Sequence, residues 1–130
     1  MKQIYATVTA GKDGYGVWLN DYPISSAATK VDELKASLRE AIELTLEVNE
    51  TLKEDFTDYE IVYTFDASAL IKYYGDFLGY PALHKITGVN SKQLWNYANA
   101  GIHPRKDKAS QILDSLRYFG KELNQIQISF

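Results

Sequence analysis

The stretch Gly79–Arg105, GYPALHKITGVNSKQLWNYANAGIHPR, contains two short helical patterns separated by a turn. Pro81 suits the first turn of a helix, because its missing N–H would have no partner there. Gly88 permits the positive φ of a helix end, and Asn90 offers a side-chain oxygen to cap a new helix beginning at Ser91. Two short helices joined at such a corner are typical of a helix-turn-helix.

The second helix of this stretch is predicted to turn a polar face outward. At about 100° per residue its apolar side chains share one face, which would point inward; they are Leu94, Tyr97 and Ala98. The polar residues are of the kinds that hydrogen-bond base edges in the major groove; they are Ser91, Lys92, Gln93, Asn96 and Asn99. The alternative is a helical hairpin whose polar residues merely face water. We favour contact with DNA.

Basic residues flank the second helix on both sides. Lys85 precedes it and Arg105 follows it, which is the arrangement of phosphate contacts that fix the register of a reading helix. Trp95 either contacts DNA or packs against a neighbouring helix or subunit. The predicted DNA-binding residues are Tyr80, Lys85, Asn90, Ser91, Lys92, Gln93, Trp95, Asn96, Arg105 and Lys106.

Length and composition allow one ordinary domain or two small ones. The chain has 130 residues, of which 45% are hydrophobic and 24% charged, and it has no cysteine. This usage is that of a globular protein, and it excludes disulfides and thiolate metal sites. We expect a cytoplasmic protein, since no apolar run approaches the roughly 20 residues of a membrane span and no signal-peptide pattern opens the chain.

Charge divides the chain into two halves. Residues 1–66 carry 6 Lys/Arg and 13 Asp/Glu, whereas residues 67–130 carry 8 Lys/Arg and 4 Asp/Glu. Such asymmetry suggests a basic nucleic-acid-binding module joined to an acidic module with another partner. We therefore predict two domains, 1–66 and 67–130.

The first half is predicted to form an α+β domain of order β-β-β-α-β. Strands are indicated by alternating or extended patterns; they cover 1–9, 15–19, 24–28 and 59–65. Thr29 is the expected cap of a helix that runs to about Asn49. Its expected inner face is Val31, Leu34, Leu38, Ala41, Ile42, Thr45 and Val48. The outer face carries Glu40, Glu43, Glu47 and Glu50, and is either solvated or covered by a cationic partner.

The second half is predicted to be all-α, with four short helices and a terminal strand. The first helix, capped by Asp66 or Ser68, carries apolar Leu70, Ile71, Tyr74, Phe77 and Leu78. The last helix follows Pro104 and packs through Ala109, Ile112, Leu113, Leu116 and Phe119. Residues 124–130 alternate as a strand does, and would either join the sheet of the first half or pair with a second copy of the chain. We expect a dimer built through this second half.

Catalytic signatures are scarce. There is no phosphate-binding loop, nucleophile elbow or zinc-binding histidine pair. Turns and helix caps account for Asp13, Asp21 and Asp66, and His84 and His103 lie beside the helix-turn-helix, where phosphate contact or a surface role suffices. We expect no enzyme, no metal and no cofactor.

Taken together, these segments resemble a HicB-type antitoxin of the helix-turn-helix variant, over essentially the whole chain. The resemblance in the first half rests on Tyr15–Trp18, Asp21–Pro23, and Thr29 leading into Leu38–Glu43. In the second half it rests on Ile86–Asn90, Gln93–Leu94, Tyr97 and Pro104–Arg105. Ile24-Ser25 depart from the Gly-Cys that commonly follows the family's proline.

The resemblance implies a partial RNase H-like domain followed by a DNA-binding domain. Its implied partners are a small basic HicA-like mRNA-cleaving toxin and the double-stranded operator DNA of the protein's own operon. The toxin-binding residues expected from the family's turn and from the acidic helix are Asp21, Tyr22, Glu40, Glu43 and Glu47. A stand-alone transcription factor, whose first half senses a ligand or only oligomerises, is the alternative, and a degenerate nuclease comes third.

Overall fold

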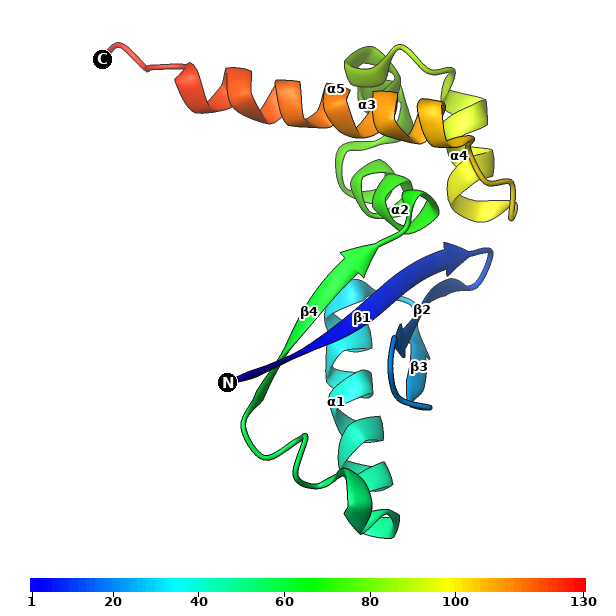
Figure 1. Cartoon of the computed structure of the whole chain (residues 1–130). Coiled ribbons are helices and arrows are strands. Elements are labelled where there is room, and N and C mark those ends of the chain that lie inside the picture. The colour runs from blue at the N-terminus through cyan, green and yellow to red at the C-terminus, as the bar shows by residue number, and fades with distance from the viewer.

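The computed structural model describes all 130 residues and has an α+β fold, as the sequence predicts (Figure 1). The four strands are β1 (Lys2–Gly11), β2 (Gly14–Leu19), β3 (Ser25–Ala28) and β4 (Tyr59–Phe65). The helices are α1 (Val31–Val48), the short 3₁₀ helix η1 (Glu50–Leu52), α2 (Ala67–Leu78), α3 (Tyr80–Thr87), α4 (Ser91–Asn99) and α5 (Lys106–Gln125). The predicted order β-β-β-α-β for the first half is confirmed.

The four strands form one mixed sheet in the order β3-β2-β1-β4. The first three make the antiparallel meander that their short connections predict, and β4 returns parallel to β1 after the α1 crossover. Because successive side chains of a strand point to opposite faces of the sheet, Ile4, Ala6 and Val8 of β1 lie on the buried face. Tyr5 and Thr7 between them point to the opposite face.

Helix α1 covers the buried face of the sheet. Val31, Leu34, Leu38 and Ile42 recur at helical spacing and are buried against it. Val48 is 86% exposed, so its predicted place in the inner face is wrong. The reason is that the last turn of α1 extends past the end of the sheet (Figure 1).

The predicted cap of α1 is also wrong. Lys30 occupies the cap position and makes no side-chain capping bond. Thr29 lies one residue earlier, and its Oγ1 donates to Glu33 at 3.4 Å. Acidic Asp32 and Glu33 in the first turn still favour this end of the helix, because its backbone N–H groups carry partial positive charge.

The helices of the second half enclose a smaller core of their own. Its buried members are Ile71, Leu83, Val89, Leu94, Tyr97, Ala98 and Ile112. Of the two caps considered for α2, Asp66 is the one formed, with its carboxylate accepting from the Ala69 N–H at 2.8 Å. Gly75 is needed for packing, because a Cβ there would come within 2.5 Å of the Tyr80 ring.

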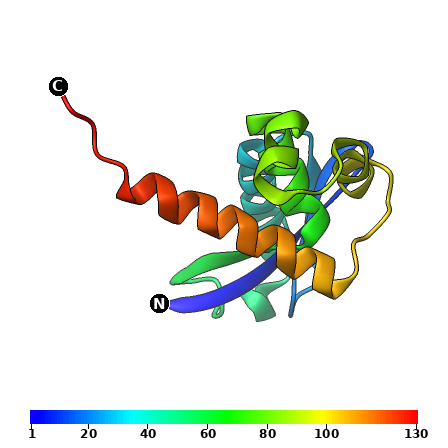
Figure 2. The same ribbon diagram turned by 90° about the horizontal axis from the view of Figure 1, so that it is seen from above.

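The predicted terminal strand is not present. Asn124 and Gln125 belong to α5, and 126–130 follow it without pairing to any strand. The helical spacing of apolar residues continues through Leu116, Phe119 and Leu123. Helix α5 therefore extends further, and it leads the chain away from the sheet (Figure 2). The last helix is therefore 20 residues long, and its tail is exposed up to Phe130.

The two halves meet where α2 and α4 approach the end of β1 and the β1–β2 turn. Lys72 of α2 is only 7% exposed, and its ammonium donates to the Gly11 carbonyl at 3.3 Å and to the Asn99 side chain. Asn99 in turn donates to the Tyr80 hydroxyl at 3.3 Å. The prediction that Asn99 points outward on α4 is therefore wrong, because it is tied into this junction.

Candidate functional site

The turn between α3 and α4 is fixed by hydrogen bonds at both of its ends. Gly88 adopts φ 75°, the left-handed conformation expected at the end of α3, and the Asn90 side chain accepts from the Lys92 N–H at 2.8 Å. The His84 ring donates from Nδ1 to the Val89 carbonyl at 2.7 Å. His84 thus braces the turn, a role that its position in the sequence did not reveal.

A hydroxyl inside the turn adds to this bracing. Thr87 donates to the Leu83 carbonyl at 2.8 Å and accepts from the Val89 N–H at 3.2 Å, and it is buried. Ser91 donates to the Tyr80 carbonyl at 3.3 Å, which ties the start of α4 to the start of α3. The orientation of α4 is therefore set by bonds within the chain.

The outward face of α4 carries three exposed side chains and one half-buried amide. Lys92, Gln93 and Trp95 are exposed, Trp95 by 50%. Gln93 is held by Tyr97, to whose hydroxyl its amide donates at 2.7 Å. The carboxamide of Asn96 and the ammonium of Lys92 make no side-chain bond within the chain, so both are free to contact a ligand.

Three other residues of the predicted DNA-binding set have positions that serve the fold. Asn90 is the cap of α4 and Ser91 bonds the α3 backbone. The Tyr80 hydroxyl accepts from Asn99 in the junction, and burial raises the pKa of Tyr80 above its ordinary value. Tyr80 therefore lies at the junction between the halves.

The cations around α4 are unpaired. Lys85, Arg105 and Lys106 are exposed, and the three ion pairs of the structure all join residues within 1–58. A hollow of about 400 Å³ opens beside α4 where the chain leads into α5. It is lined by Gln93, Tyr97, Ile102, His103, Arg105, Asp107 and Lys108. This gives the site a net positive charge.

His103 has a definite position at this hollow. Its Nδ1 lies 3.2 Å from the Ser68 hydroxyl near the start of α2. The loop that carries Arg105 is thereby attached to the body of the helical half. The contact joins residues 35 apart in the chain, so no local pattern could have predicted it.

The residues expected to contact a toxin fall into two groups. Glu40, Glu43 and Glu47 are exposed along the outward side of α1, and Lys35 and Arg39 precede them on the same helix. Asp21 and Tyr22 lie instead in the β2–β3 turn, against the segment that follows α1. The structure does not merge them into one cluster.

Tyr22 has a structural role in that turn. Its hydroxyl donates to the Asp55 carboxylate at 2.7 Å, and its ring meets Phe56 edge-on at 4.9 Å between centroids. Lys2 bonds the same carboxylate at 2.8 Å. The Lys2 ammonium, followed by the Tyr22 hydroxyl, holds the pKa of Asp55 below its ordinary value.

Two exposed aromatic residues on the sheet are not among the predicted site residues. Tyr5 and Trp18 lie on the face turned away from α1 and are 44% and 43% exposed. Both alternate with buried neighbours, Trp18 with Val17 and Leu19. Because that alternation places them outside, the signal was present in the sequence.

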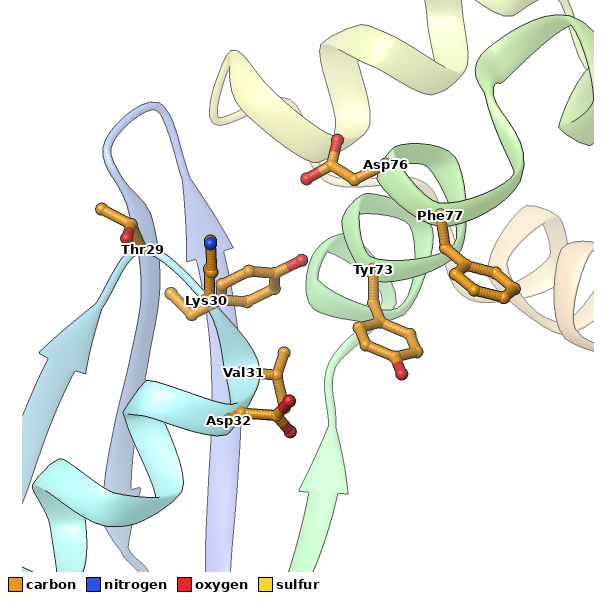
Figure 3. A pocket seen from close by; sticks show the side chains of 8 residues that line it. Thr29, Lys30, Val31, Asp32, Tyr73, Asp76 and Phe77 are labelled. Atoms are coloured by element: carbon orange, nitrogen blue, oxygen red, sulfur yellow. The ribbon is translucent and has the colours of Figure 1, made fainter.

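A second hollow of about 240 Å³ lies between the halves, at the start of α1 and beside α2 (Figure 3). Thr29–Asp32 line one side, and Tyr73, Asp76 and Phe77 of α2 line the other. Tyr15 completes the lining, and burial, assisted by the Asp76 carboxylate, raises its pKa. This hollow is the place in the chain where a small ligand could contact both halves.

Comparison with protein-family models, with curated proteins and with solved structures gives no match to this chain. None of its helices has both the length and the apolar character needed to cross a membrane. No three His, Asp or Glu side chains gather closely enough to hold a metal ion.

Proposed function

We propose that the chain is a HicB-like antitoxin that binds operator DNA through α3 and α4 and a basic HicA-like toxin through its acidic first half. One observation carries the DNA-binding part of this proposal. On α4, the Lys92 ammonium and the Asn96 carboxamide are free of bonds within the chain, while the turn that orients them is fixed by hydrogen bonds. Lys and Asn are residues that read base edges.

The unpaired cations support phosphate binding on either side of α4. Lys85 precedes the turn, and Arg105 and Lys106 follow α4 beside the hollow. Neutralising phosphates contributes most of the affinity that does not depend on sequence, and salt weakens it. Lys92 and Asn96 would then supply sequence preference, and the flanking cations would supply affinity.

The acidic half supports the toxin-binding part. Exposed Glu40, Glu43 and Glu47 give α1 an outward negative stripe, which begins just after the cations Lys35 and Arg39. A protein that binds and cleaves RNA is cationic at its active surface, so charge complementarity favours its association with this half. The resemblance of the first half to the family's toxin-binding domain points to the same partner.

Titration of DNA from upstream of the chain's own gene, at several salt concentrations, tests the DNA-binding part. Asn96→Ala should cost about 1–3 kcal/mol on the preferred sequence and relax the preference at one position. Arg105→Ala should weaken binding to all sequences and reduce the salt dependence. Lys53→Ala, which removes an exposed cation from the segment after α1, is the control. Full affinity in a Lys92→Ala, Asn96→Ala double variant would refute the assignment.

The hollow between the halves favours a second candidate function. A stand-alone regulator that senses a small ligand would need such a site in contact with both halves, and Tyr15, Asp32 and Asp76 supply polar groups there. The gene beside this one distinguishes the two functions. A short neighbouring gene that encodes a basic protein with a single functional histidine favours the antitoxin.

A further inference from the structure

An apolar groove opens between α2 and α5, beside the small core, against which Tyr74 and Leu116 of its lining pack. It has a volume of about 470 Å³ and is lined mainly by leucines and aromatic residues, among them Leu70, Tyr74, Leu113 and Leu116. Phe77, which also lines it, is 74% exposed. An exposed apolar groove of this kind is typical of an interaction surface.

The end of α5 carries an apolar stripe that nothing covers. Ile112, Leu116, Phe119 and Leu123 follow one another on one face; Ile112 is buried, whereas Phe119 is 40% and Leu123 61% exposed. The helix simply continues past the body of the protein (Figures 1 and 2). Helical segments this short are marginal in water unless their apolar face packs against something.

The tail beyond α5 continues the same character. Ile126, Ile128 and Phe130 are exposed by 66%, 74% and 114%, and no residue after Glu122 has an ionisable side chain. A groove without an occupant and an apolar segment without a partner thus lie on the same helix. Their chemistry is complementary.

The tail cannot fill the groove of its own chain. Ile126 is extended, so the chain runs on from the end of α5. The groove lies beside Leu113–Gly120, between about 9 and 20 Å back along the helix at 1.5 Å per residue. Reversing the chain takes about four residues. Residues 126–130 would nearly all be needed for that turn, so none would be left to reach the groove.

Gly120 indicates how a second copy would approach. It lies in the middle of α5, lines the groove, and has no atom within 4 Å of the place where a Cβ would be. Nothing within the chain therefore requires a glycine there, although glycine disfavours a helix by about 1 kcal/mol relative to alanine. A glycine on an exposed helix face permits a second backbone to come close.

We propose that two copies of the chain pair through α5, antiparallel and crossing at Gly120, and that each end of α5 and its tail enter the α2–α5 groove of the other copy. This register sets Leu116 of one copy opposite Leu123 of the other and brings Ile126 toward Leu113. The contact is self-complementary, as a two-fold dimer requires. It does not depend on DNA or toxin binding.

Light scattering on the full-length protein, over a range of concentrations, measures the mass. The unaltered chain should give twice its 14.7 kDa. Leu123→Asp should give the monomer, or raise the dimer dissociation constant tenfold or more, about 1.4 kcal/mol. Leu44→Asp is the matched control, since Leu44 is 55% exposed on α1, and it should keep the dimer.

The Gly120→Gln variant tests whether the dimer needs close approach of the two α5 helices, because this change should not weaken the helix itself. Glutamine favours a helix over glycine, so circular dichroism should show equal or greater helix content, while the dimer should be lost. A dimer that survives Gly120→Gln with unchanged affinity would overturn the crossing point.

Cross-linking tests the register, because the chain has no cysteine of its own. A mixture of Leu116→Cys and Leu123→Cys chains should form a mixed disulfide faster than either chain links to itself. Preferential self-linking would refute the antiparallel register. A monomeric mass for the unaltered protein at every concentration would overturn the proposal, whether the groove holds the chain's own tail or an unrelated protein.

Discussion

The two halves of the molecule differ in how their charged and apolar groups are used. In residues 1–66 the core is the larger of the two, and every ion pair of the structure is formed there. In residues 67–130 the core has 7 buried residues, the exposed cations are unpaired, and an apolar groove is open. The helical half therefore leaves more of its charged and apolar side chains without a partner within the chain.

Lys72 is the exception to this contrast, and it joins the two halves. It is the cation of the helical half that is buried, and its ammonium bonds the β1–β2 turn on one side and α4 on the other. It also lies 6.0 Å from the centroid of the Tyr15 ring. Lys72 therefore helps to hold α4 against the end of β1.

Lys72→Met should lower the stability of the folded protein more than the other substitutions do. The partly buried Gly11 carbonyl and Asn99 side chain would lose their donor, and leaving such groups unpaired costs about 1–3 kcal/mol of the free energy of unfolding. Urea denaturation of the full-length protein measures it. Lys92→Met, at an exposed lysine of the same half, should change stability by no more than about 0.5 kcal/mol. Equal effects of the two changes would contradict the role of Lys72.

Asp55 should make a smaller contribution to the free energy of unfolding, and this contribution should change only at acidic pH. Because Lys2 and Tyr22 lower the pKa of Asp55 in the folded protein, its contribution is present above the ordinary value of 3.8 and is lost as the pH falls through the lower folded value. Asp55→Asn should therefore flatten the dependence of stability on pH below about 4. Asp21→Asn is the control, because the Asp21 carboxylate contacts no cation. An unchanged acid slope in Asp55→Asn would show that the contact contributes nothing.

Local patterns were sufficient to predict most of the elements. Alternation gave the strands, and Gly88 and Asn90 marked the α3–α4 turn, because each of these signals acts within a few residues. The buried faces of β1 and α4 followed from the same periodicities. The order of the sheet beyond the meander could not be read in this way.

Several of the failures have a common physical cause, since they depend on contacts between residues distant in the chain. Asn99 has a polar side chain on an outer helical position, yet Lys72 of another helix draws it into the junction. The alternation in 124–130 resembles a strand, but a strand needs a neighbour and α5 carries this segment away from the sheet. His84 bonds the Val89 carbonyl across the α3–α4 turn. His103 contacts the Ser68 hydroxyl, 35 residues away in the chain.

If the two halves bind different partners, one titration series separates the two activities. The unaltered chain and two variants are titrated with upstream DNA and with the product of a gene beside the chain's own that encodes a small basic protein. We expect Lys92→Ala, Asn96→Ala to lose sequence-specific DNA binding and keep the protein partner. Charge reversal at Glu40, Glu43 and Glu47 to lysine should do the opposite. Loss of both partners by either folded variant, or of neither by both, would contradict the claim.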